Sequence, residues 1–236
     1  MQPVIFEDLG IIDYKSAWDY QEKRLKENVD IKVYARINHP TLIPADLNTK
    51  HTFLLCEHTP VYTLGKSGSI ENILLNNIQL QEKEIAFFHT NRGGDITFHG
   101  LQQMVGYPIL DLEKFYTDIG KYLRNIEEVI ILTIGEYGIK GERSPGETGV
   151  WIDAGIKGSE RKICAIGVRC SRWVTMHGFA LNVNTDLDYF NYIIPCGITG
   201  KQVTSMEKEC NRKIEYDIVK EKIKKNFERV FDAQLI

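Results

Sequence analysis

The chain has 236 residues, of which 43% are hydrophobic and 26% are charged, an ordinary composition for a soluble globular protein. Its formal net charge of -3 excludes a polybasic protein that binds nucleic acid through bulk charge. No apolar run approaches the roughly 18 residues of a membrane span, and the N-terminus lacks a signal-peptide pattern. We therefore expect a cytoplasmic chain that does not contact membranes.

The first half of the sequence predicts short strands and one amphipathic helix. Apolar residues from Tyr14 to Leu25 follow helical spacing, which predicts a helix over about 14–28. The segment 61–65 is expected to continue the strand 51–58 after Pro60, and residues 70–84 to be irregular or a short helix. The predicted strands are 4–9, 51–58, 61–65, about 85–89, 95–98 and 104–110.

The second half predicts helices at 115–136 and 214–232, the latter with Ile214, Ile218, Ile223, Phe227 and Phe231 on one apolar stripe. Strands are predicted at 149–153, 162–171 and 174–183. Because strands and helices do not alternate strictly, the pattern favours an α+β fold with a mixed, largely antiparallel sheet flanked by helices. The length fits one domain over 1–236, with the tail from about 206 to 236 as a satellite region.

The five cysteines indicate reduced thiols rather than a disulfide framework, because their number is odd and no export signal precedes them. They form no C-x-x-C pair and match no zinc-site spacing, so no metal is expected. Each one could simply be a small buried hydrophobic residue. They are Cys56, Cys164, Cys170, Cys196 and Cys210.

Two motifs are candidates for a functional site, because they are richer in glycine, histidine or charge, or place a cysteine more openly, than a purely structural segment usually does. In NRGGDITFHG (91–100), adjacent glycines allow close approach of the backbone to a ligand, although a hairpin turn explains them as well and His99 could be structural. In IIPCGI (193–198), Cys196 follows a proline and precedes a glycine, a context that presents a thiol at the end of an element. A nucleophilic thiolate needs a nearby cation. The candidates are Lys162, His99 and His177.

Four segments in order resemble the lipoyl(octanoyl) transferases, which share the fold of the biotin- and lipoate-protein ligases. The resemblance spans about Phe53 to Ser205. It departs from the family at Leu101 and Gln102, where a Pro-Gly pair is usual. The segments are LLCEHTPVYTLGKSG, NRGGDITFHGLQQMVGYPILDL, KICAIGVRCSRWVTMHGFALNVNTDL and IIPCGI.

The resemblance implies an acyltransferase that moves octanoyl from octanoyl-acyl carrier protein to a lysine through a cysteine thioester, without a cofactor. Cys196 would be the nucleophile, and Lys162 would lower the pKa of its thiol and shuttle the proton. The acceptors would be lipoyl domains of 2-oxoacid dehydrogenase complexes and the glycine cleavage H protein. The implied acyl site comprises Arg92, Gly93, Gly94, Asp95, Ile96, Thr97, Phe98, His99, Ala165, Ile166, Gly167, Gly178, Phe179 and Ala180.

Acyl carrier proteins are acidic, so a basic rim would attract them. The basic stretch 157–172 carries five cations against one glutamate, and it could serve this purpose or be a solvated strand face. Its cations are Lys157, Arg161, Lys162, Arg169 and Arg172.

Three other functions remain open at this point. A lipoate-protein ligase of the same fold would use ATP, but such ligases usually carry a third glycine where this chain has Asp95. An octanoyl amidotransferase would also use a cysteine. A non-catalytic acyl- or carrier-binding module would need neither Cys196 nor Lys162.

Overall fold

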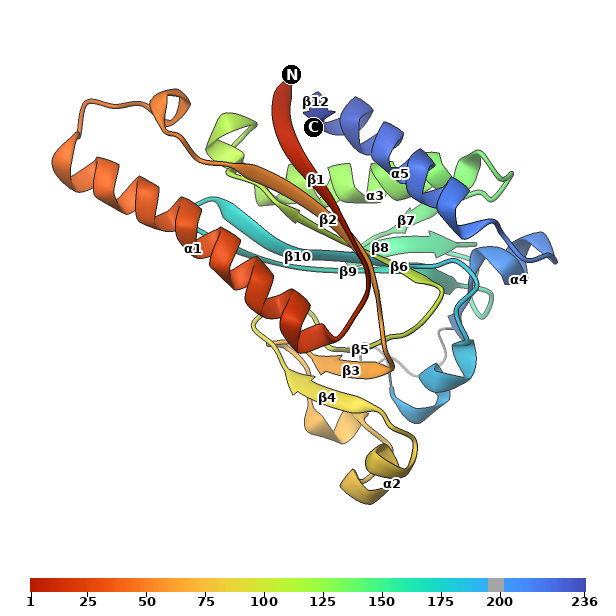
Figure 1. The fold of residues 1–236 in the computed structure, drawn as a ribbon. Helices are drawn as coiled ribbons and strands as arrows, with labels where there is room; N and C mark the ends of the chain where they lie inside the picture. The colour runs from red at the N-terminus through yellow and green to blue at the C-terminus, as the bar shows by residue number, and fades with distance from the viewer. Residues whose placement is uncertain (195–201) are drawn as a thin grey trace.

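A large mixed sheet forms the centre of the computed structural model, which describes residues 1–194 and 202–236. Its nine strands are β1 (Gln2–Ile12), β2 (His51–His58), β6 (Gln103–Ile109), β7 (Glu142–Ser144), β8 (Glu147–Ile152), β9 (Arg161–Ser171), β10 (Val174–Asn182), β11 (Gln202–Val203) and β12 (Ala233–Leu235). The order is β12-β1-β2-β6-β10-β9-β8-β7, with β11 beside β9 (Figure 1). Strand β1 is parallel to β12 and β2, β11 is parallel to β9, and the other neighbours are antiparallel. The predicted α+β fold is confirmed.

A second, three-stranded sheet lies below the first in Figure 1 and has the order β4-β3-β5. It consists of β3 (Val61–Leu64), β4 (Ala86–His89) and β5 (Ile96–His99). The expectation that 61–65 continues the preceding strand is therefore wrong. Pro60 ends β2, and β3 pairs instead with strands from later in the sequence.

Helices cover both faces of the main sheet (Figure 1). On one face, α3 (Ile119–Gly135) and α5 (Tyr216–Phe231) pack against it; on the other lies α1 (Tyr14–Asn38). The prediction for 115–136 begins too early, because Asp118 caps α3 by accepting from the Lys121 N–H. The shorter helices are α2 (Asn77–Glu82), α4 (Met206–Cys210), η1 (Pro44–Asp46), η2 (Ile70–Asn72), η3 (Leu112–Lys114) and η4 (Leu187–Tyr192).

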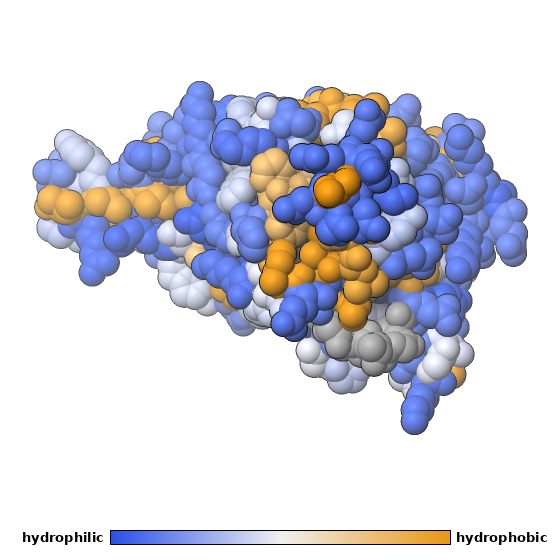
Figure 2. Space-filling view, turned by 90° about the horizontal axis from the view of Figure 1, so that it is seen from below, coloured by the Kyte–Doolittle hydropathy of each residue, from blue (hydrophilic) through white to orange (hydrophobic). Residues whose placement is uncertain are grey.

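Helix α1 is ten residues longer than its apolar spacing predicts. Beyond Asn28 the helix is anchored by an ion pair between Lys32 and the fully buried Asp111, and its last residues lie outside the core. Tyr34 and Ile37 are exposed there, and Figure 2 shows an apolar stripe along this protruding end. The helix ends where Pro40 follows, since a proline disfavours helical backbone before it.

The C-terminal tail is built into the main core. Ile223, Phe227 and Phe231 of α5 are buried among residues of α3 and the sheet, and Phe227 stacks on Phe53 with ring centroids 4.2 Å apart. Strand β12 then pairs with β1. Ile218, which the predicted stripe includes, is instead 51% exposed. Residues 206–236, which the sequence predicts to be a satellite region, therefore contribute a helix to the main core and a strand to the main sheet.

Candidate active site

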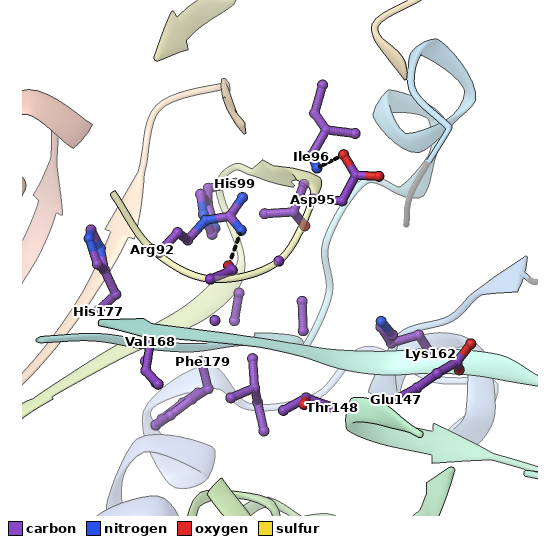
Figure 3. A pocket seen from close by; sticks show the side chains of 18 of the residues that line it. Arg92, Asp95, Ile96, His99, Glu147, Thr148, Lys162, Val168, His177 and Phe179 are labelled. Carbon is purple, nitrogen blue, oxygen red and sulfur yellow. Dashed lines mark hydrogen bonds between the residues drawn. The ribbon is translucent and has the colours of Figure 1, made fainter. Parts of the chain in front are cut away.

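A cavity of about 510 Å³ lies between the two sheets, where the loop 91–95 crosses β9 and β10 (Figure 3). Residues 92–97 and His99 line one side, and residues of β9 and β10 line the other. Of the positions that the resemblance implies, those that line the cavity are Arg92, Gly93, Gly94, Asp95, Ile96, Thr97, His99, Lys162, Ala165, Ile166, Gly167, Gly178, Phe179 and Ala180. Motifs up to about 90 residues apart in sequence thus meet at one place.

Phe98 is the one described position of the implied acyl site that does not line the cavity. Its side chain is buried in a separate cluster beneath the small sheet. There it stacks on Tyr189 at 4.5 Å and meets Phe190 edge-on at 5.5 Å between centroids. Phe98 therefore supports the wall of the cavity from behind.

The glycine loop is held by backbone hydrogen bonds on two sides. The Gly65, Lys66 and Ser67 N–H groups donate to the carbonyls of residues 95, 92 and 94 at 3.3, 3.0 and 3.1 Å. The Gly93 N–H donates to the Val168 carbonyl of β9 at 2.9 Å. The turn after β3 and the RGGD loop therefore form one rigid unit that closes over β9.

Arg92 is buried and bonded within this unit. Its Nη2 donates to the carbonyl and hydroxyl oxygens of Thr63 at 2.6 and 2.9 Å, and its Nη1 donates to the Gly93 carbonyl at 3.0 Å. Asp95 accepts from the Ile96 N–H at 2.6 Å and from the side-chain amide of Asn72 at 2.7 Å. These contacts fix the loop geometry around the cavity.

Two glycines allow backbones to approach closely at the cavity floor. A Cβ atom at Gly167 would lie 2.9 Å from the Gly93 carbonyl oxygen. A Cβ atom at Gly178 would lie 2.1 Å from the Gly106 carbonyl oxygen. Both contacts are with backbone, so a side chain at either position would force main-chain movement.

The hydrogen bonds of His99 define its tautomer. Gln103 donates its amide nitrogen to the Phe98 carbonyl and to Asn182 Oδ1, at 3.1 and 2.9 Å, so its oxygen must accept. His99 Nδ1 therefore carries the proton and donates to Gln103 Oε1 at 2.9 Å. Burial lowers the pKa of His99 well below its usual value, helped by the neighbouring His58 and Arg92. The ring is neutral.

Burial removes the charge from two of the three cation candidates that the sequence indicates, His99 and His177. Burial lowers the pKa of His177 to about 3, with Arg92 and Arg169 adding to the effect. His177 and His99 therefore cannot favour a thiolate by charge. In Figure 3, Lys162 lies beside Glu147, and Arg92 lies between Lys162 and His177 in this view. The Lys162 Nζ is 4.5 Å from the Trp151 ring centroid.

Cys196 lies outside the described residues. Phe190 and Val203, which are described and lie on either side of it in the sequence, both line the cavity. Burial raises the thiol pKa of Cys56, Cys164 and Cys170. Cys56 and Cys164 fit the interpretation of buried hydrophobic cysteines, whereas Cys170 and Cys210 are only partly buried.

The basic stretch 157–172 is partly neutralised within the molecule. Arg161 pairs with Asp153 and Glu209, and Arg169 pairs with Glu22. A basic rim for an acidic partner is therefore smaller than the sequence indicates.

Leu101 and Gln102, where the sequence departs from the family pattern, form a turn after β5. Gln102 adopts φ 59°, a left-handed conformation that favours glycine, which is usual there in the family the chain resembles. Its carbonyl accepts from the Asn184 N–H and from the Thr185 hydroxyl, both at 3.1 Å, which holds this conformation. His99 keeps its place beside the cavity.

Several lining residues escape sequence reasoning. Tyr14 begins α1, Tyr107 lies on β6, and Glu147 and Thr148 begin β8, all outside the glycine motifs. Gln103 is the last residue of the HGLQQ segment, and its place beside His99 in that motif indicates a residue of the site. Among residues 1–194 and 202–236, no group of three His, Cys, Asp or Glu could hold a metal ion, and no helix is long and apolar enough to cross a bilayer.

Comparisons with known proteins agree in sequence and in fold. Residues 13–228 match the lipoyl protein ligase A/B catalytic domain. The chain is 58% identical over 229 residues to an octanoyltransferase of Christiangramia forsetii, covering 97% of this chain and 95% of that protein. It is 56% identical to an octanoyltransferase of Flavobacterium johnsoniae, covering 98% and 97%.

Solved structures show the same fold at low sequence identity. A lipoate-protein ligase A bound with ATP superposes with a TM-score of 0.67 at 13% identity, covering 100% of this chain and 87% of that one. A bi-partite lipoate protein ligase from Thermoplasma acidophilum gives 0.68 at 15% identity, covering 100% and 85%. The ligase-like fold implied by the sequence resemblance is confirmed.

Proposed function

The chain belongs to the lipoyl protein ligase A/B catalytic domain family, and on this premise we propose that it is an octanoyltransferase that uses Cys196 and Lys162. It transfers octanoyl from octanoyl-acyl carrier protein to a lysine of lipoyl domains, including the H protein. The observation that carries the proposal is the meeting of RGGDITFH, AIG and GFA at one cavity with Lys162 in its wall. The close relatives are named octanoyltransferase, which indicates octanoyl as the acyl group that is transferred.

The proposed reaction has two acyl-transfer steps. The Cys196 thiolate attacks the octanoyl thioester carbonyl, a new C–S bond forms, and the carrier thiol leaves with a proton. The lysine amine of the lipoyl domain then attacks the Cys196 thioester, an amide forms, and the Cys196 thiolate is released. Lys162 favours the thiolate by its charge and exchanges the proton in each step.

The experiment combines intact mass and alkylation. Mixed with octanoyl-acyl carrier protein without ATP, the protein is expected to gain one octanoyl group and to pass it to a lipoyl domain. Cys196→Ala should abolish both, whereas Cys170→Ala should retain the adduct. In a background lacking Cys170 and Cys210, Lys162→Ala should slow iodoacetamide alkylation of Cys196 at neutral pH and raise its pH midpoint by about one unit or more.

Lys162→Arg should preserve alkylation but lose transfer, because a guanidinium does not release its proton at working pH. Normal transfer by Cys196→Ala would refute the covalent mechanism. A strict ATP requirement would favour the ligase alternative. Matching alkylation profiles for the wild type and Lys162→Ala would remove Lys162 as the activator.

A further inference from the structure

One carboxylate on α1 accepts hydrogen bonds from three donors around the cavity. Glu22 Oε1 accepts from the side-chain amide of Asn91 at 2.7 Å and from the guanidinium of Arg169 at 2.6 Å. The indole N–H of Trp18 approaches the same oxygen at 3.3 Å. Asn91 belongs to the glycine loop and Arg169 to β9, so Glu22 joins helix, loop and strand at one point.

The contacts continue through Asn91 to a cavity residue. Because the Asn91 amide nitrogen donates to Glu22, its oxygen is the acceptor for the His177 Nε2–H at 2.8 Å. The His177 N–H donates to Gln21 Oε1 at 2.9 Å, one residue before Glu22. His177 has φ 57° inside the buried strand β10, a left-handed conformation that neighbours must hold in place. Helix α1 therefore contacts His177 directly through Gln21 and indirectly through Glu22 and Asn91.

These contacts fix the start of the glycine loop independently of its end. Asn91 directly precedes Arg92, whereas Asp95 at the other end is bound by Asn72. Between them, the Gly93 N–H donates to the Val168 carbonyl, one residue before Arg169. A shift of Asn91 would therefore reach Arg92 and the Gly93 contact first.

We propose that Glu22 is a positioning residue that holds the start of the RGGD loop against β9, and with it the shape of the acyl cavity. The identity of the ligand rests on the proposed function, whereas the loop geometry does not. Arg92 and Lys162 lie at separate places along the cavity (Figure 3). A displaced loop should therefore weaken binding of the acyl donor more than it slows the chemical steps near Lys162.

Glu22→Gln tests this role, with Glu27→Gln as the matched control on the same helix. Glu27 makes a half-exposed i,i+3 contact with Arg24 and does not touch the loop. Loss of a charge-assisted hydrogen bond should raise the KM for octanoyl-acyl carrier protein about tenfold in Glu22→Gln, with kcat within about threefold. Glu27→Gln should leave both values unchanged. Adding Glu22→Gln to Asn91→Ala should raise the KM little further, because Asn91→Ala has already removed the contact between Glu22 and the loop.

Hydrogen exchange gives a second readout that needs no turnover. The Gly93 amide should exchange faster in Glu22→Gln than in the wild type or Glu27→Gln. Unchanged Gly93 exchange, or a lowered Tm with KM unchanged, would overturn the positioning role. Absence of octanoyl transfer by the wild type would refute the proposed function, while the exchange comparison would still decide whether Glu22 positions the loop.

Discussion

Gly167 lies where the RGGD loop crosses β9, with no room for a side chain. In Gly167→Ala the new methyl group would meet the Gly93 carbonyl at 2.9 Å and the Arg92 Cδ at 3.3 Å, so the loop must move. We expect kcat/KM for octanoyl transfer to fall roughly 10- to 100-fold, because small displacements in a binding site are costly. Steady-state kinetics and thermal unfolding measure the two effects separately.

Gly135→Ala is the control for this substitution. Gly135 ends α3, and nothing lies within 4 Å of its added Cβ. This variant should keep full activity and gain up to about 1 kcal/mol of stability from helix propensity. Full activity of Gly167→Ala would mean that the loop tolerates the added methyl group.

At the scale of elements, α5 offers a matched pair of isoleucines. Ile223 is fully buried in the main core, whereas Ile218 on the same helix is 51% exposed. Ile223→Ala should lower the free energy of unfolding by about 2–5 kcal/mol, and Ile218→Ala by about 0.5 kcal/mol or less. Urea unfolding distinguishes them. Equal small losses would indicate that the tail is a satellite after all.

Helices and strands with a strong local pattern can be predicted from the sequence. Strands that form only by pairing with a distant segment cannot. The alternation in 162–171 and 174–183 locates β9 and β10 within about one residue. The two- and three-residue strands β7, β11 and β12 carry no periodicity of their own, since each exists only through its partner strand. The transfer of β3 to a second sheet is equally non-local.

The candidate site follows the same division. Glycine and histidine motifs identify the loop and the floor because each motif is contiguous in sequence. Tyr14 and Tyr107 reach the cavity from elements whose sequences show only core patterning. Glu22 is missed for a similar reason, because a glutamate on an amphipathic helix is usually a solvated residue. Only the fold shows that it faces Asn91 and Arg169.

At the scale of the whole molecule, the cavity exists because two sheets and α1 converge on it. The rings of Tyr14 and His99 stack at 5.9 Å, and His58 lies edge-on to both at 5.4 and 5.8 Å. His58 Nδ1–H donates to the Ile12 carbonyl at 2.8 Å, so the other nitrogen of the neutral ring, Nε2, accepts from the Tyr107 hydroxyl at 2.7 Å. The junction between the layers is therefore made of buried, uncharged histidines. Its stability depends on their staying uncharged.

Acid should destabilise the protein through these histidines well above the range of carboxylate protonation. Burial lowers the pKa of His51 and His58 to about 4 and that of His177 to about 3, and it lowers the pKa of His99 strongly. An unfolded histidine titrates near 6.5, so below that pH the unfolded chain binds more protons than the folded one. The stabilisation is complete above about pH 6.5 and is lost as the pH falls toward the folded-state values. Below about pH 6.5, each of these histidines should lower the free energy of unfolding by about 1.4 kcal/mol per pH unit.

Urea unfolding between pH 8 and 5.5 measures how steeply the free energy of unfolding depends on pH. His58→Gln should reduce it by about one proton, whereas His39→Gln, at an exposed site, should not change it. Equal stability at pH 8 and 5.5 would show that these histidines do not control unfolding.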